Sequence, residues 1–200
     1  FPYTTLFRSF SWRVTGTSQV WKVNQPKGFP IQMTGGEDNT SLVGITPDGK
    51  WLIHSRDRSG EENPGIYLQS TEGGMLKVIQ HKAKVQTSLQ WISDDSQFLI
   101  YKANDVKSDS YAFYKYEIAT GKSDLIVSLD GYWGIVDSRP DGRLLFMKAL
   151  TNTASEFYEW NPSSKEMKPI IGQNEKEDYS VKYAPKENEF FVLTPKKGDF

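Results

Sequence analysis

Residues 46–74, TPDGKWLIHSRDRSGEENPGIYLQSTEGG, decide the fold of this chain. The segment starts with Thr46-Pro47-Asp48-Gly49, which predicts a tight turn. Proline presets φ, aspartate can accept a hydrogen bond from nearby backbone, and glycine takes a left-handed conformation without a Cβ clash. Two β-rich runs follow, separated by a polar loop. We therefore expect a strand at 51–55, a loop at 56–64, a strand at 66–70, a turn at 71–74 and a strand at 75–79.

This unit recurs along the chain with a nearly fixed step. Four versions of the turn, the last of them degraded, are spaced by 47, 46 and 45 residues and start at Thr46, Ser93, Arg139 and Ala184. An aromatic residue in the strand after the loop keeps a similar step, at Trp21, Tyr67, Tyr114 and Tyr158. A period in the forties filled with short strands is typical of β-propeller blades. Each blade has an apolar face that only a neighbouring blade can cover.

The repeat predicts an all-β fold, a partial β-propeller of about four blades of four antiparallel strands, truncated at both ends. We expect 17 strands and no helix of consequence, as counted from the repeat in the sequence. The first expected blade lacks its first strand and the last one only begins, so we expect a fragment of a longer polypeptide. The expected blades span about 10–34, 41–79, 87–128, 132–171 and 179–200.

Residues 1–9, FPYTTLFRS, are treated separately. They resemble the translation of a common sequencing-library adapter rather than protein sequence, so they are left out of the fold prediction. On this interpretation the true N-terminus is missing, and the lack of a signal peptide carries no information about location.

Composition excludes some classes of function and leaves the compartment open. The net charge is −1, which gives no strong case for binding nucleic acid or an anionic membrane. No stretch approaches the roughly 20 apolar residues that span a bilayer. The chain has no cysteine, and hence no disulfide and no thiolate zinc site. Periplasmic, secreted and cytoplasmic locations all remain open.

The connections between expected strands fall into two groups. In a four-stranded antiparallel meander, the first–second and third–fourth turns share one end, and the other loops share the opposite end. Functional residues on such scaffolds usually lie on the longer loops. We therefore expect function in the central channel or on the face formed by the longer connections, which are 35–40, 56–64, 81–86, 103–110, 149–155 and 172–178.

No arrangement of residues points to catalysis in this chain. The sequence contains no G-x-S-x-G motif, and its two histidines are His54, in an expected strand, and His81, expected to be a solvated loop residue. Loop carboxylates lack the regular spacing of a calcium loop. We assign no catalytic, cofactor-binding or metal-binding residue and expect no cofactor. The recurring turn aspartates are expected to be structural, and the recurring aromatic residues are expected to be core.

One charged cluster is a candidate contact site. Arg56, Arg58, Glu61 and Glu62 lie together in the loop 56–64. The carboxylates could recognise the amine of a peptide terminus, in contact with a substrate or a neighbouring domain. Alternatively, the cluster could be an ion-pair network that ties the loop to the neighbouring blade. Both interpretations remain open at this point.

The order of the motifs indicates a family resemblance. GTSQVW at 16–21 precedes IQMTGG at 31–36, TPDGK at 46–50, DRSGEEN at 57–63, Tyr67-Leu68 and Gly73-Gly74. This order resembles the N-terminal propeller of prolyl oligopeptidase-family serine peptidases, in the acylaminoacyl-peptidase-like branch. Similar repeats occur in TolB-like propellers. The resemblance covers about 10–200, although the second turn lacks its glycine and the fourth lacks its aspartate.

The resemblance implies a role for the whole polypeptide. In that family the propeller caps a C-terminal α/β-hydrolase domain, admits short peptides and excludes folded proteins. The catalytic triad belongs to the hydrolase domain, and no position here matches it. The expected partners are therefore that domain and short peptides. The alternative is a TolB-like propeller that acts as a protein-interaction module with no enzyme attached.

Overall fold

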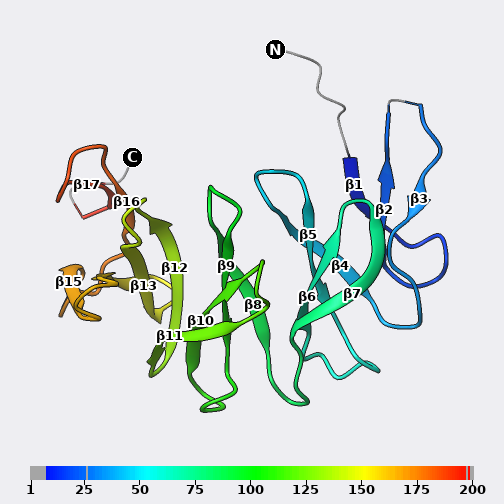
Figure 1. Ribbon diagram of the computed structural model, residues 1–200. Coiled ribbons are helices and arrows are strands. Elements are labelled where there is room, and N and C mark those ends of the chain that lie inside the picture. The colour runs from blue at the N-terminus through cyan, green and yellow to red at the C-terminus, as the bar shows by residue number, and fades with distance from the viewer. Residues whose placement is uncertain (1–7, 26, 197, 199–200) are drawn as a thin grey trace. The chain divides into compact units, whose positions relative to one another are not determined.

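The computed structural model describes residues 8–25, 27–196 and 198, and in these residues it contains 17 strands and no helix (Figure 1). The part of the chain so described therefore has no helix that could cross a membrane. The strands are β1 (Arg8–Trp12), β2 (Gln19–Val23), β3 (Ile31–Gln32), β4 (Thr40–Ile45), β5 (Trp51–Arg56), β6 (Gly65–Ser70), β7 (Gly73–Gln80), β8 (Thr87–Ile92), β9 (Phe98–Ala103), β10 (Tyr111–Glu117), β11 (Ser123–Leu129), β12 (Tyr132–Ser138), β13 (Leu144–Thr151), β14 (Ala154–Trp160), β15 (Met167–Ile171), β16 (Ser180–Tyr183) and β17 (Phe190–Leu193).

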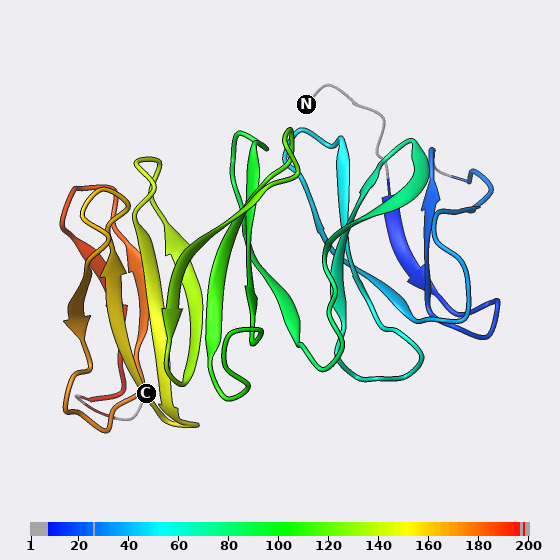
Figure 2. The same cartoon turned by 60° about the horizontal axis from the view of Figure 1, so that its bottom comes forward.

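These strands form five meandering sheets, each built from strands consecutive in sequence. The sheets are β1–β3, β4–β7, β8–β11, β12–β15 and β16–β17, so three of them have four strands. Each meander can be followed by its colour in Figure 2. The chain divides into two compact units, Phe1–Ser108 with Ala112–Ser128 and Asp109–Tyr111 with Leu129–Phe200. The predicted class, all-β with four-stranded antiparallel modules, is confirmed.

The N-terminal strand includes part of the segment that resembles an adapter. Arg8 and Ser9 pair with Val23 and Lys22 at the start of β1. Residues 1–7 of that segment lie outside the described residues. Whether the segment belongs to the natural protein stays a prediction from the sequence.

The recurring turns have the predicted geometry. Gly49 has φ +69° and its N–H donates to the Thr46 carbonyl oxygen at 2.8 Å. Ser96 takes the same left-handed place in the second turn, with φ +61°, and Gly142 takes it in the third, with φ +88°. In the fourth turn the left-handed residue is Asn188, one position later, which explains why the following strand is displaced by one residue.

The turn aspartates are structural, as predicted. Asp48, Asp95 and Asp141 each accept a hydrogen bond through Oδ1 from the backbone N–H two residues on. Asp48 Oδ1 also accepts from the Thr46 hydroxyl at 2.7 Å. These bonds, with the Thr46 hydroxyl first, lower the pKa of Asp48. The carboxylates therefore stabilise the turns in their ionised form.

Two predicted connections are wrong. Residues 73–74 do not turn the chain, because Ser70 pairs with Gly73 and the turn is made by Thr71 and Glu72. The long loop expected at 149–155 is a two-residue hairpin connection, because Thr151 pairs with Ala154. Thr151 has a β-branched side chain that suits a strand, so β13 extends into the stretch assigned to the second connection.

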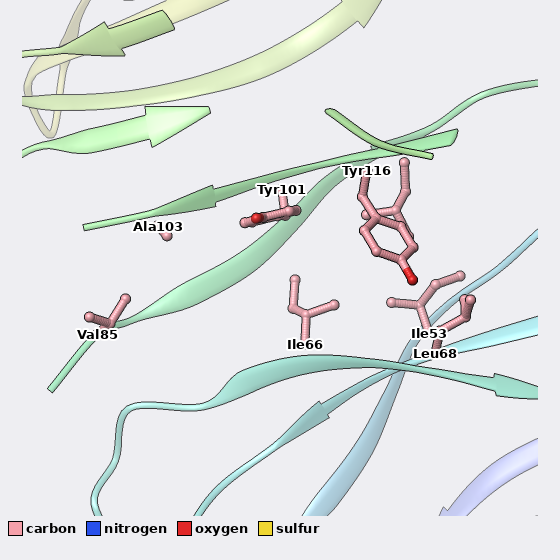
Figure 3. Packing of buried hydrophobic residues seen from close by; sticks show 8 residues of the cluster. Ile53, Ile66, Leu68, Val85, Tyr101, Ala103 and Tyr116 are labelled. Carbon is pink, nitrogen blue, oxygen red and sulfur yellow. The ribbon is translucent and has the colours of Figure 1, made fainter. Parts of the chain in front are cut away.

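The core of the first unit lies between the β4–β7 and β8–β11 sheets. Ile53, Ile66 and Leu68 point from β5 and β6 toward Tyr101 and Tyr116, as Figure 3 shows. Leu99, Ala103 and Val85 complete this cluster, and Ile53, Ile66, Leu68, Leu99 and Ala103 have no exposed surface. A cluster of this kind covers the apolar face that one sheet alone would leave exposed.

The second unit uses the same principle with fewer strands. Leu145 and Phe157 of the β12–β15 sheet are buried with Tyr179, just before β16, and with Val181 of β16. Arg139, from the third turn, donates to the carbonyl oxygens of Ala184 and Lys186. These two bonds hold the fourth turn, 184–187, which lacks the aspartate of the other turns.

The prediction that the recurring aromatic residues belong to the core is wrong. Trp21, Tyr67, Tyr114 and Tyr158 are all partly buried. Each tyrosine hydroxyl binds a polar side chain, namely His81, Asp105 and Glu156 respectively. The phenol needs a hydrogen-bonding partner, so the rings lie at the border of the core rather than inside it.

Candidate functional site

Three of the longer loops of the first unit meet at one end of their sheets. The Asp57 N–H donates to the Asn39 carbonyl oxygen at 3.1 Å, and the Ser59 N–H donates to Asp38 Oδ1 at 2.8 Å. The Thr87 N–H donates to the Pro64 carbonyl oxygen at 3.2 Å. The loops before β4, after β5 and before β8 therefore share a face in this unit, as the meander predicts. We call this end of the unit the long-loop face.

Arg56 is held at the base of this face. Its guanidinium donates to Thr40 Oγ1 at 2.8 Å and to the Gly35 carbonyl oxygen at 3.0 Å. It also lies 3.7 Å from an Asp38 carboxylate oxygen, and its side chain is only 15% exposed. These contacts tie β5 to the loop of the preceding sheet.

Arg58, Glu61 and Glu62 lie in the same loop and are exposed. The loop is ordered by its backbone, since the Glu61 N–H donates to the Arg58 carbonyl oxygen at 3.0 Å. Ser59 and Glu62 have φ of +52° and +56°, a conformation that most side chains avoid. The sequence predicted these charged residues together, and the structure places them on one loop of the long-loop face.

His81 belongs to this site, although the sequence suggested a solvated loop residue. Its Nδ1 is hydrogen-bonded to the Tyr67 hydroxyl, and the two rings meet edge to face at 5.6 Å. Burial, with the charge of Arg58 second, lowers the pKa of His81, so the ring is neutral at pH 7. Its Nε2 is buried and has no partner among the described residues.

Gly65 is what allows His81 this position. A Cβ at residue 65 would lie 2.5 Å from the His81 Cβ and Cγ atoms, closer than real atoms approach. The signal was present in the sequence as a glycine at the start of a β-rich run, but its partner lies 16 residues away.

A groove of about 560 Å³ lies directly beside this loop. Val43 of β4, Ser55 of β5 and Ile66 of β6 line one side, and residues of β8, including Thr87 and Trp91, line the other. Pro64 lines it too. The loop 56–63 is therefore flanked by two lining residues, Ser55 before it and Pro64 after it. None of the lining residues is charged. The volume is in the range of small-ligand sites.

Both inner strands of the groove carry a β-bulge. The β4–β5 register shifts between Leu42 and Gly44, and the β8–β9 register shifts between Leu89 and Trp91. A third shift, between Ile135 and Asp137, keeps the period of the repeat in β12. Bulges bend a strand and re-aim side chains, often beside functional sites. Sequence reasoning missed them because the bulged residues have no common type.

Two loop carboxylates, Asp105 and Glu175, have protein partners. Asp105 accepts from the Tyr114 hydroxyl, and Glu175 pairs with Lys196 at 2.8 Å. In the described part of the chain, no three histidine or carboxylate side chains gather as a metal site would need.

Comparison with known proteins gives matches at the level of structure. No protein-family model and no curated protein matches the sequence. A prolyl endopeptidase matches with TM-score 0.69 and 13% identity, covering 95% of this chain. TolB from Acinetobacter baumannii matches with TM-score 0.60 and 14% identity, covering 96% of this chain. Both matches lie in β-propeller folds. The chain is a partial β-propeller.

The propeller spans only part of each similar structure. It covers 31% of the prolyl endopeptidase chain and 51% of the TolB chain. An oligogalacturonate lyase in complex with manganese is also similar, with TM-score 0.62 and 17% identity, and the match covers 83% of this chain and 49% of that one. At such identities the comparison establishes the fold. Each sheet described above is therefore a blade.

Proposed function

We propose that this propeller is a non-catalytic part of a serine peptidase of the prolyl oligopeptidase family. In this proposal it gates or positions short peptides for a C-terminal α/β-hydrolase domain of the same polypeptide. The parent enzyme cleaves peptides through an acyl-enzyme, and the nucleophile belongs to the hydrolase domain. Nothing in this role requires a cofactor in the propeller.

One observation carries the proposal. The match to the prolyl endopeptidase covers 95% of this chain but only 31% of that chain, as expected if the propeller is one part of a two-part enzyme. The absence of a G-x-S-x-G motif from the 200 residues is consistent with a nucleophile elsewhere. The order of the turn, loop and glycine motifs supports the same family.

The long-loop face supplies the proposed contact with peptides. The loops there combine four cations, Arg56, Arg58, Lys82 and Lys84, with five carboxylates, Glu37, Asp38, Asp57, Glu61 and Glu62, an excess of one negative charge. Excess negative charge favours the ammonium group of a peptide N-terminus through charge-assisted hydrogen bonds. Arg56 already has protein partners, so we assign contact with the peptide to Arg58, Glu61 and Glu62.

The decisive experiment reads the gene beyond the codon for Phe200. A G-x-S-x-G motif followed by Asp and His is expected, and a stop codon after one or two further blades would overturn the peptidase role. In the complete protein, Glu61→Gln with Glu62→Gln should raise KM for a peptide with a free N-terminus. The same substitutions should leave KM for the N-acetylated peptide unchanged. Glu72→Gln, an exposed carboxylate in a turn at the opposite end of the blade, is the control.

The alternative is a TolB-like interaction propeller with no enzyme attached. One observation favours it: this chain covers 61% of a putative TolB from Agrobacterium tumefaciens, compared with 31% of the prolyl endopeptidase. The two functions differ in a simple measurement. A serine-directed fluorophosphonate should label the complete protein if the peptidase role holds, and should leave it unlabelled if the chain only binds partners.

A further inference from the structure

We propose that the groove between the first and second complete blades binds the uncharged body of an extended peptide. The peptide would lie along the inner edges of β4 and β8, with one large apolar side chain in the groove. This proposal takes from the proposed function only the class of ligand, a peptide. It assigns a binding role to residues outside the charged loop, chiefly Val43, Thr87 and Trp91.

The lining determines which ligand is favoured. The lining residues include no Asp, Glu, Lys or Arg, and apolar surface predominates over polar surface. A charged side chain in the groove would lose water without gaining a partner, which is costly. An aromatic or aliphatic side chain would instead gain by burial against Val43, Ile66 and Trp91. The occupant is therefore neutral along the part that enters the groove.

The backbone around the groove favours an extended ligand. β4 and β8 are both edge strands, each at one end of its sheet. An edge strand presents N–H and C=O groups that its own ladder does not use, and an added strand can pair with them. The bulges at Val43 and Gln90 bend β4 and β8, so these two edge strands do not form a regular ladder with each other.

The groove is closed at one end by close packing. A Cβ on Gly44 would lie 2.7 Å from the Ile92 Cδ1 atom and 2.8 Å from the Leu89 Cδ2 atom. The two strands therefore touch beside the bulge, where a larger residue would have to displace the ends of these two side chains. Thr87 and Pro64, at the other end, belong to the long-loop face, so a ligand would enter from that side.

Thr87 provides an independent sign that a ligand belongs here. It lines the groove and is 4% exposed, and its Oγ1 is buried without a hydrogen-bond partner among the described residues. A buried hydroxyl without a partner is unfavourable, and most such groups in proteins are satisfied. A peptide amide at the groove would supply the partner once the Thr87 side chain rotates toward it, because the buried Oγ1 atom has no surface open to the groove in the present rotamer.

The test uses this chain and a blocked tetrapeptide, N-acetyl-Ala-Phe-Ala-Ala-amide, titrated in amide NMR spectra. The blocked termini remove the charge on which the proposed contact with Glu61 and Glu62 depends. We expect shifts confined to β4, β8 and their neighbours, and a measurable dissociation constant. Replacing the peptide phenylalanine by aspartate should weaken binding at least about tenfold. Methylating the backbone nitrogen of that phenylalanine should weaken it as well, because pairing with an edge strand needs the N–H group.

Variants of the chain complete the test. Val43→Asp puts a charge in the groove at a position that is 43% exposed, so the fold should tolerate it, and affinity should fall at least about tenfold. Val78→Asp is the control, a valine that is 59% exposed on the outer strand of the same blade, and should bind like the parent chain. Thr87→Val, which removes the unpaired hydroxyl and keeps the shape, should weaken binding several-fold without loss of stability.

The outcomes separate this proposal from the proposed function. Unchanged affinity in Val43→Asp and Thr87→Val, or equal binding of the aspartate or N-methylated peptide, would overturn the groove site. If the blocked peptide does not bind at all, the groove proposal fails, while the effect of Glu61 and Glu62 on peptides with a free N-terminus still decides the function. Conversely, blocked-peptide binding with a stop codon shortly after Phe200 would support the groove and overturn the peptidase.

Discussion

The two faces of the β4–β7 blade are packed in different ways. One face meets the β8–β11 blade through the apolar cluster of Ile53, Ile66 and Leu68. The other meets the β1–β3 sheet through buried polar side chains. Gln69 is 1% exposed, donates to the carbonyl oxygens of Met33 and Gly74, and accepts from His54. Alternate residues of the same strands thus face two different environments.

The two interfaces have different roles: the apolar one contributes stability, and the polar one fixes the position of one sheet against the next. Apolar burial is not directional, so the first interface gains stability from area and tolerates adjustment. Hydrogen bonds to particular carbonyl groups fix the position of one sheet against the next. At the polar face Lys22 Nζ donates to the Thr71 carbonyl oxygen at 2.7 Å, and Gln69 Nε2 donates to the Met33 carbonyl oxygen at 2.9 Å. We expect the first interface to be the stronger and the second to be sensitive to pH.

The largest effect should come from the apolar face. Leu68→Ala removes a side chain with no exposed surface from the cluster and should destabilise the chain by about 3–5 kcal/mol. Urea unfolding followed by tryptophan fluorescence measures the change. Val78→Ala, at a position 59% exposed on β7, should cost less than about 0.5 kcal/mol. If the two substitutions cost the same, the cluster is not the main interface.

The next effect belongs to His54 on the polar face. Burial, opposed by the hydrogen bond to Gln69 and assisted by the Arg56 charge, lowers the pKa of His54 from 6.5 to about 4. The unfolded chain therefore binds a proton between these values while the folded chain does not. Stability is complete above about pH 6.5 and is lost as pH falls toward 4, by on the order of 3 kcal/mol.

A variant without a titrating ring at this position isolates that contribution. His54→Gln keeps a donor for Gln69 and removes the titration, so its unfolding free energy should fall less between pH 7 and pH 4 than that of the parent chain. All other groups, including His81, are common to both and cancel in the difference. Parallel pH profiles would show that His54 is hydrated in the folded chain and that the polar face is open.

Gln69 should have an intermediate effect. Gln69→Leu leaves the His54 Nε2–H and the Met33 and Gly74 carbonyl oxygens without this partner, and should cost about 2 kcal/mol. Gln97→Leu is the control, since Gln97 is exposed in a turn. A gain in stability for Gln69→Leu would mean that the face is better filled by apolar packing, and that polar registration has no role in the fold.

The sequence was sufficient for the repeat but not for the contrast between the faces. The turn at Thr46 and the strand after it follow from local preferences and a fixed step, so they could be predicted. Whether His54 is buried depends on Gln69, which lies 15 residues on, and on the carbonyl group of Met33, which follows β3 of another sheet. No local pattern contains that information.

The candidate site shows the same division. The charged loop could be located from composition, and its exposure follows from its polarity. The burial of His81 depends on the missing Cβ of Gly65, and the groove depends on bulges at Val43 and Gln90 that have no shared residue type. Contact between Arg58, Glu61 or Glu62 and a peptide stays a prediction.

The smallest effect should distinguish two arginines of the charged loop. Arg56→Gln removes donors to Thr40 and Gly35 and an ion pair with Asp38 at 3.7 Å, and should destabilise the chain by about 1 kcal/mol. Most of this loss should remain at high salt because the Thr40 and Gly35 acceptors are uncharged, and only the part due to Asp38 should be screened. Arg58→Gln, at an exposed position in the same loop, should change stability by less than about 0.5 kcal/mol. Unfolding at about 0.1 M and about 1 M NaCl measures both. Equal losses that disappear at high salt would mean that the loop is held by charge alone. In that case Arg56 would not belong to the set of directional hydrogen bonds, such as those of Gln69, that position one sheet against the next.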